Sequence, residues 1–272
     1  MQLSSLKKQY LSLKQGKDSL LQLVDENEMP VAVYNSNEIE SKSSALFEQQ
    51  ATASVLAISN LASVHNYVKA MATERKANSE IVLQLHEKLM ASVDIKSAGQ
   101  YRDQHVSFNG RMAPAPELIG TLVNELFLDY YNQENNTLLE RVAKFHLEFV
   151  VIHPFNSGVG RIARALINYQ LIEIGYPPIV IRASDQTAYA KCFDDFEASR
   201  KVKSLVELLE VSLKESLNHR IAYLSGMKII NLVDHARDIK LSESAMLNKA
   251  KRQTIPAFRE GGRWKIGVGY AM

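Results

Sequence analysis

The chain has 272 residues, 46% of them hydrophobic, and a formal net charge of +2, so it can bury a substantial core and its charge does not indicate a nucleic-acid or membrane partner for the chain as a whole. A single cysteine, Cys192, excludes an internal disulfide and a cysteine-rich zinc site. No stretch approaches the roughly 18 to 20 uncharged apolar residues that span a bilayer, and the N-terminus lacks a signal-peptide core, so we expect a soluble, cytoplasmic protein.

Most of the chain follows the helical period. Apolar residues recur at three- and four-residue intervals, which predicts a mainly α-helical fold with short loops. Residues 3–27, which are heavily charged, are also predicted to be helical. The other segments with this spacing are 51–72, 79–91, 115–132, 137–152, 160–174 and 203–224.

Residues 100–116, QYRDQHVSFNGRMAPAP, depart from the helical period. Val106 and Phe108 alternate with polar neighbours before the pair Asn109-Gly110, which favours a tight hairpin turn. Two prolines follow and end the pairing. The sequence therefore predicts a short β-hairpin here.

The run HPFNSGVGRIAR, which begins at His153, predicts an anion site, most plausibly for phosphates. Gly158 and Gly160 bracket a turn whose backbone amides can point into one concavity, and the helix that follows adds its own unpaired amides and its dipole. On that helix Arg161 and Arg164 share a face, so both guanidinium groups can reach one phosphate chain. His153 lies upstream, where it can accept a proton from a nucleophile that attacks the phosphate.

The spacing of this run resembles the signature of the Fic family, H-x-F-x-[D/E]-G-N-G-R-x-x-R. The flanking segments HLEFVVIHPF and LINYQLIEIGYPP are also similar to the family. Two positions depart from the signature: Ser157 stands where the family carries a magnesium-holding carboxylate, and Val159 where it carries a phosphate-contacting asparagine. The matching positions are His153, Phe155, Gly158, Gly160, Arg161 and Arg164.

The resemblance implies a Fic-type helical bundle that transfers AMP from ATP to a serine, threonine or tyrosine hydroxyl of a target protein. His153 would be the general base, the amides from Gly158 to Gly160 the cradle for the α- and β-phosphates, Arg161 a β-phosphate contact and Arg164 a γ-phosphate contact. Family members also transfer other phosphate-containing groups or remove AMP, so the transferred group rests on the resemblance. The nucleotide-binding residues that it implies are Phe155, Asn156, Gly158, Val159, Gly160, Arg161, Arg164 and Tyr189.

Two further segments resemble regulatory and target-binding parts of the family. VYNSNEIESKSSAL, in a predicted helix at about 31–48, is similar to the inhibitory helix S-x-x-x-E-[G/N], with Ser36 and Glu40 matching. A buried arginine would explain a carboxylate at an otherwise apolar turn, and the predicted partner is Arg164. The predicted hairpin resembles the flap that docks a target strand along its exposed edge. Its contributing residues are Gln104, His105, Val106, Ser107 and Phe108.

The two departures weaken the expected chemistry. The resemblance implies that the reaction requires magnesium. The ion would lack its protein carboxylate here, because a serine hydroxyl is a weaker, neutral ligand. Valine removes a hydrogen bond to phosphate worth about 1.5 to 3 kcal/mol, and both losses fall on the transition state more than on binding. A non-catalytic nucleotide-binding regulator is therefore the alternative. His146 lies two helical turns before His153, but no third ligand follows at suitable spacing, so no protein metal site is predicted.

The last part of the chain predicts a small arm. Residues 249–270 combine a basic helix end, a strand, a Gly-Gly turn and a second strand, and resemble the helix and wing of excisionase-type DNA-binding segments. The predicted division is an N-terminal helical region at 1–90, a Fic core at 91–215 and a winged-helix-like arm at 216–272. DNA binding by the arm stays open on its basic residues, which are Lys249, Lys251, Arg252, Arg259, Arg263 and Lys265.

Overall fold

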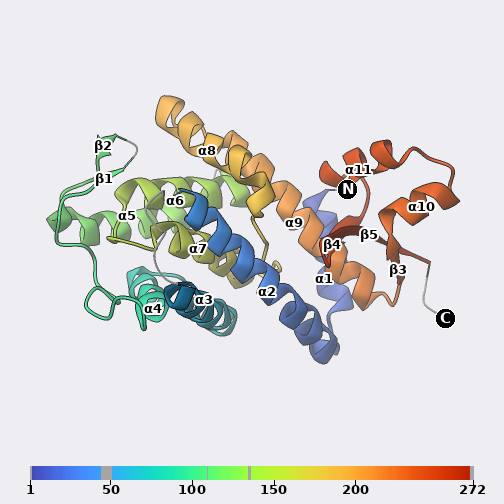
Figure 1. Ribbon diagram of the computed structural model, residues 1–272, viewed down its shortest axis with the longest axis horizontal. Helices are drawn as coiled ribbons and strands as arrows, with labels where there is room; N and C mark the ends of the chain where they lie inside the picture. The colour runs from blue at the N-terminus through green and yellow to red at the C-terminus, as the bar shows by residue number, and fades with distance from the viewer. Residues whose placement is uncertain (1, 44–50, 109, 134–135, 270–272) are drawn as a thin grey trace. The chain divides into compact units, whose positions relative to one another are not determined.

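The computed structural model describes residues 2–43, 51–108, 110–133 and 136–269 and is mainly helical, as the sequence predicts (Figure 1). Residues 44–48 of the predicted inhibitory segment and Asn109 of the hairpin turn lie outside the described residues. The helices are α1 (Leu3–Leu13), α2 (Asp18–Ser43), α3 (Ala51–Met71), α4 (Ser79–Met90), α5 (Ile119–Asn132), α6 (Leu138–Ile152), α7 (Val159–Glu173), α8 (Gln186–Ser199), α9 (Lys203–Leu224), α10 (Leu232–Asp238) and α11 (Glu243–Lys251). The strands are β1 (Ser107–Phe108), β2 (Arg111–Met112), β3 (Lys228–Asn231), β4 (Ala257–Glu260) and β5 (Arg263–Val268), and two short 3-10 helices are η1 (Pro116–Leu118) and η2 (Ala183–Asp185).

The chain divides into two compact units. The core unit comprises residues 29–174 and 180–206, and the arm unit comprises residues 1–28, 175–179 and 207–272. The long helix α2 and the helix α9 each contribute residues to both units. Within the described residues, no helix combines the length and the apolar character that crossing a membrane requires.

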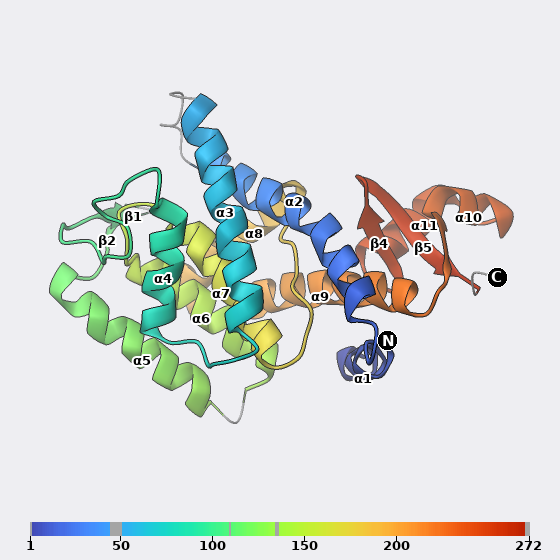
Figure 2. The same cartoon turned by 90° about the horizontal axis from the view of Figure 1, so that it is seen from below.

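In the core unit, α3 packs on α4 and α7, and α6 packs on α5 and α7 (Figure 2). The reason is visible in α6, where Val142, Phe145 and Phe149 recur at helical spacing and are all at most 2% exposed. Thr137 and Glu140 begin α6 with a reciprocal capping box, which satisfies the first free amides of the helix. These contacts fix the end of α6 and the start of α7, between which the motif lies.

The hairpin is present: β1 and β2 pair antiparallel, with Ser107 opposite Met112 and Phe108 opposite Arg111. The stretch at 3–27 is helical as predicted, but it belongs to two helices. Helix α1 ends at Leu13 and α2 begins at Asp18, because Gly16 takes a φ of +70° and turns the chain between them.

The arm unit contains a three-stranded antiparallel sheet in the order β3-β5-β4. The sequence predicts the pair β4 and β5 but misses β3. Helices α10 and α11 cover the sheet with a core of their own. That core consists of Leu232, Ala236, Met246, Ala250, Ala257 and Ile266.

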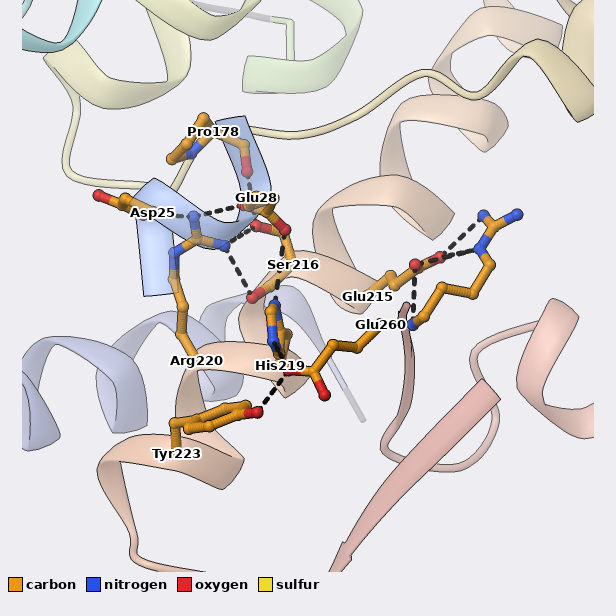
Figure 3. Close-up of polar contacts among 10 residues, drawn as sticks. Asp25, Glu28, Pro178, Glu215, Ser216, His219, Arg220, Tyr223 and Glu260 are labelled. Atoms are coloured by element: carbon orange, nitrogen blue, oxygen red, sulfur yellow. Dashed lines mark hydrogen bonds and ion pairs between the residues drawn. The ribbon is translucent and has the colours of Figure 1, made fainter. Parts of the chain in front are cut away.

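Buried charges tie α9 to the first part of α2 within the arm unit (Figure 3). Arg220 is 1% exposed, and its Nη2 donates to Asp25 Oδ1 at 2.7 Å and to Glu28 Oε2 at 2.6 Å. Its Nη1 donates to Ser216 Oγ at 2.7 Å. Burial alone would raise the pKa of Glu28, but Arg220 and His219 together lower it to about 2. The carboxylate is therefore charged at neutral pH.

The same helix also holds the hairpin of β4 and β5. The Arg259 guanidinium binds the Glu215 carboxylate through both of its oxygens, at 2.9 to 3.1 Å, and the Arg259 amide donates to Glu215 Oε1 at 3.1 Å. His219 stacks on Phe258 with ring centroids 4.6 Å apart, and Glu260 accepts a hydrogen bond from Tyr223. The hairpin is thus fixed to α9 by paired charges as well as by apolar packing.

Candidate functional site

One cavity in the core unit collects most of the motif. Its volume is about 480 Å³, within the range of small-molecule sites. Residues of α2, of the junction between α6 and α7, and of α8 line it. The lining residues are Ile39, Glu40, Val150, His153, Asn156, Ser157, Gly158, Val159, Gly160, Arg161, Arg164, Gln186, Tyr189, Ala190, Phe193 and Asp194.

His153 ends α6 in a left-handed conformation, with φ 49° and ψ 61°, and Pro154 prevents the helix from continuing. The His153 amide donates to Phe149 O at 3.2 Å. Burial is the main cause that lowers the pKa of His153, and the positive charge of Arg102 lowers it further. The imidazole is therefore neutral at pH 7, the form that can accept a proton.

The glycine turn brings backbone close to the cavity. Gly158 has a φ of +79°, and a Cβ there would lie 2.8 Å from Leu89 Cδ2, so both conformation and space require glycine. A Cβ on Gly160 would lie 2.8 Å from Glu40 Oε2 and 3.1 Å from Arg164 Nη1. The Glu40 carboxylate thus lies against the first turn of α7, where free amides and the helix dipole favour an anion.

Arg164 is held by α2. Its Nε donates to Ser36 Oγ at 2.9 Å, and its Nη2 donates to Ser36 O at 2.8 Å and lies 3.5 Å from Glu40 Oε2. The predicted contact between Glu40 and Arg164 is therefore present, with shorter hydrogen bonds to Ser36 beside it. The inhibitory role of the contact remains a prediction.

Arg161 also faces the cavity. Burial lowers its pKa, while the nearby Glu40 carboxylate favours its charged form. Its Nε is buried and has no hydrogen-bond partner in the described part of the chain. A buried guanidinium N–H without an acceptor is costly, so an anion in the cavity would stabilise it.

Ser157 and Val159 do not fit a magnesium ion held by the protein. The Ser157 hydroxyl donates to the sulfur of Met90 at 3.6 Å, and Val159 is 4% exposed and offers no side-chain ligand. Magnesium prefers carboxylate and phosphate oxygens, and these two side chains supply only one neutral oxygen. In the described residues, no group of three histidine, cysteine or carboxylate side chains is arranged to hold a metal.

His146 supports the cavity from behind. Its Nδ1 lies 3.2 Å from Ala163 O and its Nε2 lies 2.7 Å from the Tyr189 hydroxyl. Burial lowers the pKa of His146 to about 3, so the ring stays neutral. His146 is thus a buried histidine with a hydrogen-bond partner at each ring nitrogen. Tyr189 lines the cavity and is oriented by this hydrogen bond.

The other predicted residues separate into two groups. Asn156 is exposed and lines the cavity, whereas Phe155 is fully buried, stacks on His86 at 3.7 Å between ring centroids and does not line it. The flap residues Gln104, His105, Val106 and Ser107 do not line the cavity either. Gln104, His105 and Ser107 are exposed, Val106 is partly buried, and Phe108 belongs to β1.

Sequence reasoning missed Arg102. Its guanidinium donates to the backbone oxygen of His153 at 2.7 Å and to that of Gln104 at 2.7 Å, so it joins the motif to the predicted flap. No local pattern marks this arginine, because the carbonyl oxygens that it binds can be identified only after the chain has folded.

Comparison with known proteins points to the family that the motif resembles. The model of the Fic/DOC family matches residues 76–171. A protein adenylyltransferase Fic of Drosophila sechellia is 27% identical over 191 residues, which is 68% of this chain and 39% of the relative. A crystal structure of a Fic domain containing signaling protein from Bacteroides thetaiotaomicron aligns with a TM-score of 0.68 and 22% identity, covering 82% of this chain and 97% of that one. A Fic family protein from Desulfovibrio desulfuricans aligns over 99% of this chain and 96% of its own, with a TM-score of 0.61 and 16% identity.

The helical fold, the motif turn and the family match define a Fic domain. The chain therefore contains a Fic domain, at residues 76–171. It spans about two fifths of the length of the curated relative that it matches.

Proposed function

We propose that this protein transfers AMP from ATP to a hydroxyl side chain of a target protein. One observation carries the proposal: the neutral His153, the Gly158 to Gly160 turn and two arginines line a single cavity large enough for a nucleotide. A curated relative that matches 68% of the chain is named a protein adenylyltransferase, which supports the same reaction.

In this mechanism His153 accepts the proton of the target hydroxyl as its oxygen attacks the α-phosphorus of ATP. The new bond forms between that oxygen and the α-phosphorus, the bond from the α-phosphorus to the bridging oxygen breaks, and pyrophosphate leaves. Amides at the start of α7 and the guanidinium groups of Arg161 and Arg164 neutralise the charge on the phosphates. Each step uses this chain's own groups.

The contact of α2 with the cavity supports autoinhibition. Glu40 places a carboxylate beside Gly160 and 3.5 Å from Arg164 Nη2, in the position that the resemblance gives to the γ-phosphate. Two anions cannot share that arginine without repulsion, so the carboxylate competes with ATP. Removing Glu40 should free the arginine.

The test is label transfer from a tagged ATP analogue. We expect Glu40→Gly to bind ATP more tightly than the parent and to incorporate more label into itself, and Glu40→Gly with His153→Ala to bind ATP equally well without transferring label. Persistent transfer by the double variant would exclude His153 as the base. Circular dichroism checks that each variant is folded.

A second candidate is a nucleotide-binding regulator that does not turn over. The Ser157 hydroxyl against Met90 and the buried Val159 favour it, because neither assists a transition state with extra phosphate charge. Calorimetry separates the two candidates. ATP binding that does not depend on magnesium, together with absence of label from folded Glu40→Gly, would favour the regulator.

The positive charge of the arm favours nucleic-acid binding as an additional candidate function. Residues 225–269 carry nine lysines and arginines against four carboxylates, although the chain as a whole is only +2. Arg259 and Lys265 are paired with Glu215 and Glu260, which leaves fewer free cations than the sequence suggests. Of the six basic residues that the sequence singles out, the exposed ones are Lys249, Lys251 and Arg252 at the end of α11 and Arg263 in β5.

Fluorescence anisotropy with a labelled DNA duplex tests this candidate. Changing Lys249, Lys251 and Arg252 together to glutamine should weaken binding and make it less sensitive to salt, because phosphate contacts release counterions. Arg237→Gln, which alters an exposed cation already bound to Glu243 at 2.8 Å, is the matched control. Equal binding by both variants would remove the arm from nucleic-acid recognition.

A further inference from the structure

Arg102 is a buried cation whose acceptors are backbone carbonyl oxygens. It is 3% exposed, and its Nε donates to His153 O at 2.7 Å while its Nη1 donates to Gln104 O at 2.7 Å. Its Nη2 donates to Pro114 O at 2.6 Å and to Ile152 O at 3.4 Å. Burial lowers the pKa of Arg102, as expected where no carboxylate among the described residues pairs with it.

These acceptors belong to two different parts of the core unit. Ile152 and His153 are at the C-terminal end of α6, where carbonyl groups lack helical partners and the helix dipole favours a cation. Gln104 precedes β1 and Pro114 follows β2, so these two residues lie at the base of the flap. A single guanidinium therefore closes the base of the flap and caps the helix that presents the histidine.

The backbone of His153 benefits most from this capping. The left-handed conformation of His153, with φ 49° and ψ 61°, is strained for a residue other than glycine. The Arg102 side chain holds the His153 carbonyl, and the Arg102 amide donates to the next carbonyl, that of Pro154, at 3.0 Å. Arg102 thus fixes the two peptide groups that follow His153 in the chain.

We propose that Arg102 is a positioning residue that holds the flap and His153 in register, so that a hydroxyl presented by a flap-bound target lies within reach of the imidazole. This inference rests on the proposed transferase function. It assigns to Arg102 a role that its sequence context does not indicate. Lysine should not replace it, because an ammonium group lacks the planar fork that reaches carbonyls in different directions.

The test compares Arg102→Lys, which keeps the charge, with Arg102→Met, which keeps the bulk, both in the Glu40→Gly background. We expect ATP affinity to stay within about twofold. Self-labelling at a saturating concentration of the tagged ATP analogue should fall by roughly tenfold to a hundredfold, because His153 is then misplaced. Arg102→Met should also move the acidic limb of the rate profile to higher pH, because the nearby cation that favours neutral His153 is lost. Arg141→Lys is the control, since Arg141 also donates to a carbonyl, that of Tyr130, and does not line the cavity.

A second readout does not require turnover. Hydrogen exchange of residues 104–114 should quicken in both Arg102 variants and stay unchanged in Arg141→Lys. If folded Arg102→Lys shows parental transfer and parental exchange, the positioning role is wrong. If Glu40→Gly itself transfers nothing, the transferase proposal fails, and exchange together with the nuclear magnetic resonance titration of His153 decides the role of Arg102 separately. If Arg102→Met does not fold, transfer and exchange in the lysine variant alone decide whether the positioning role holds.

Discussion

Ser157 is the residue where this site differs most from the signature that it resembles. Its hydroxyl faces a thioether, a weak acceptor, and so contributes little to holding a charged ligand. Val159 is buried and supplies no donor. The site can still hold phosphates through amides and arginines, but the two positions add nothing to transition-state stabilisation.

Restoring both groups should therefore raise activity. In the Glu40→Gly background, adding Ser157→Asp and Val159→Asn should increase label transfer by orders of magnitude, since about 1.4 kcal/mol of barrier is a factor of ten in rate. The increase should depend on magnesium, because the new carboxylate supplies the missing ligand type. Initial rates with tagged ATP at equal protein concentration measure it.

Ser157→Asn is the matched control for that experiment, because it has the shape of aspartate without its charge. It should leave the rate near that of Glu40→Gly. A folded triple variant that binds ATP and labels nothing would exclude a weakened transferase. Strong labelling by Glu40→Gly alone would show that serine and valine are tolerated.

Most of the nucleotide-binding residues that the sequence predicts lie in one continuous run, residues 155–164. Turn and helix geometry bring Gly158, Arg161 and Arg164 to one cavity without long-range information. Phe155 shows the limit: the same run contains it, but stacking on His86 turns it into the core. The role of Arg102 could not be predicted, because it depends on hydrogen bonds to carbonyl groups up to 51 residues away in the sequence.

At the scale of the element, α2 is the helix that brings Ile39 and Glu40 to the cavity. The sequence predicts helical segments at 3–27 and at about 31–48, and α2 runs from Asp18 to Ser43 as one helix that contains Pro30. An interior proline costs about 3 kcal/mol. Contacts on both sides of it offset that cost: Arg220 binds Asp25 and Glu28 in the arm unit, and Ser36 binds Arg164 in the core unit.

The same contacts predict how Arg164 affects ATP. Arg164→Ala should weaken ATP binding, and the loss should be larger in Glu40→Gly, where the arginine is not already facing a carboxylate. A charge-assisted hydrogen bond is worth about 1.5 to 3 kcal/mol, or roughly 10- to 100-fold in affinity. Calorimetric titration of the four proteins in this cycle gives the coupling, and Arg141→Ala controls for loss of an arginine. Equal losses in both backgrounds would separate Glu40 from Arg164.

The flap makes a prediction that depends on its register. Ala113 N donates to Val106 O at 3.0 Å, and bonded pairs alternate along an antiparallel ladder, so the Ser107 amide faces the outer edge of β1. Ser107→Pro should block docking of a target strand while autolabelling and thermal stability stay unchanged. Phe108→Pro is the contrast, because it removes a donor inside the hairpin. A large loss of stability in Ser107→Pro would mean that the flap edge is structural.

At the scale of the whole molecule, two units fold around separate cores. The sequence predicts helices in both units better than it predicts which distant residues pair with one another. It misses β3, since the four residues KIIN show no distinctive alternation and their partner β5 lies more than 30 residues later. It also cannot show that Arg259 and Lys265 are paired, which changes the charge available for a ligand. Local periodicity can be recognised in the sequence, whereas the pairing of distant residues is known only from the fold.

Arg220 offers a test of how the arm unit is held. Arg220→Met removes the guanidinium that binds Asp25 and Glu28, whose side chains are 16% exposed, and should destabilise the unit by about 3 to 5 kcal/mol at pH 7. Urea unfolding followed by the fluorescence of Trp264, the single tryptophan, reports this unit, because β5 belongs to it. Arg237→Met, at an exposed pair, should change stability by less than about 0.5 kcal/mol.

The pH dependence should reverse between the two proteins. In the parent, the pKa of Glu28 is about 2, below its ordinary value of 4.5, so its contribution to stability is present above pH 4.5 and is lost as the pH falls from there towards 2. Without Arg220, we expect burial, the largest single effect on Glu28, to outweigh the remaining effect of His219 and to raise the pKa of Glu28 above its ordinary value. Lowering the pH through that raised pKa should then stabilise the variant. Parallel acid profiles would mean that Arg220 does not hold this carboxylate in its charged form.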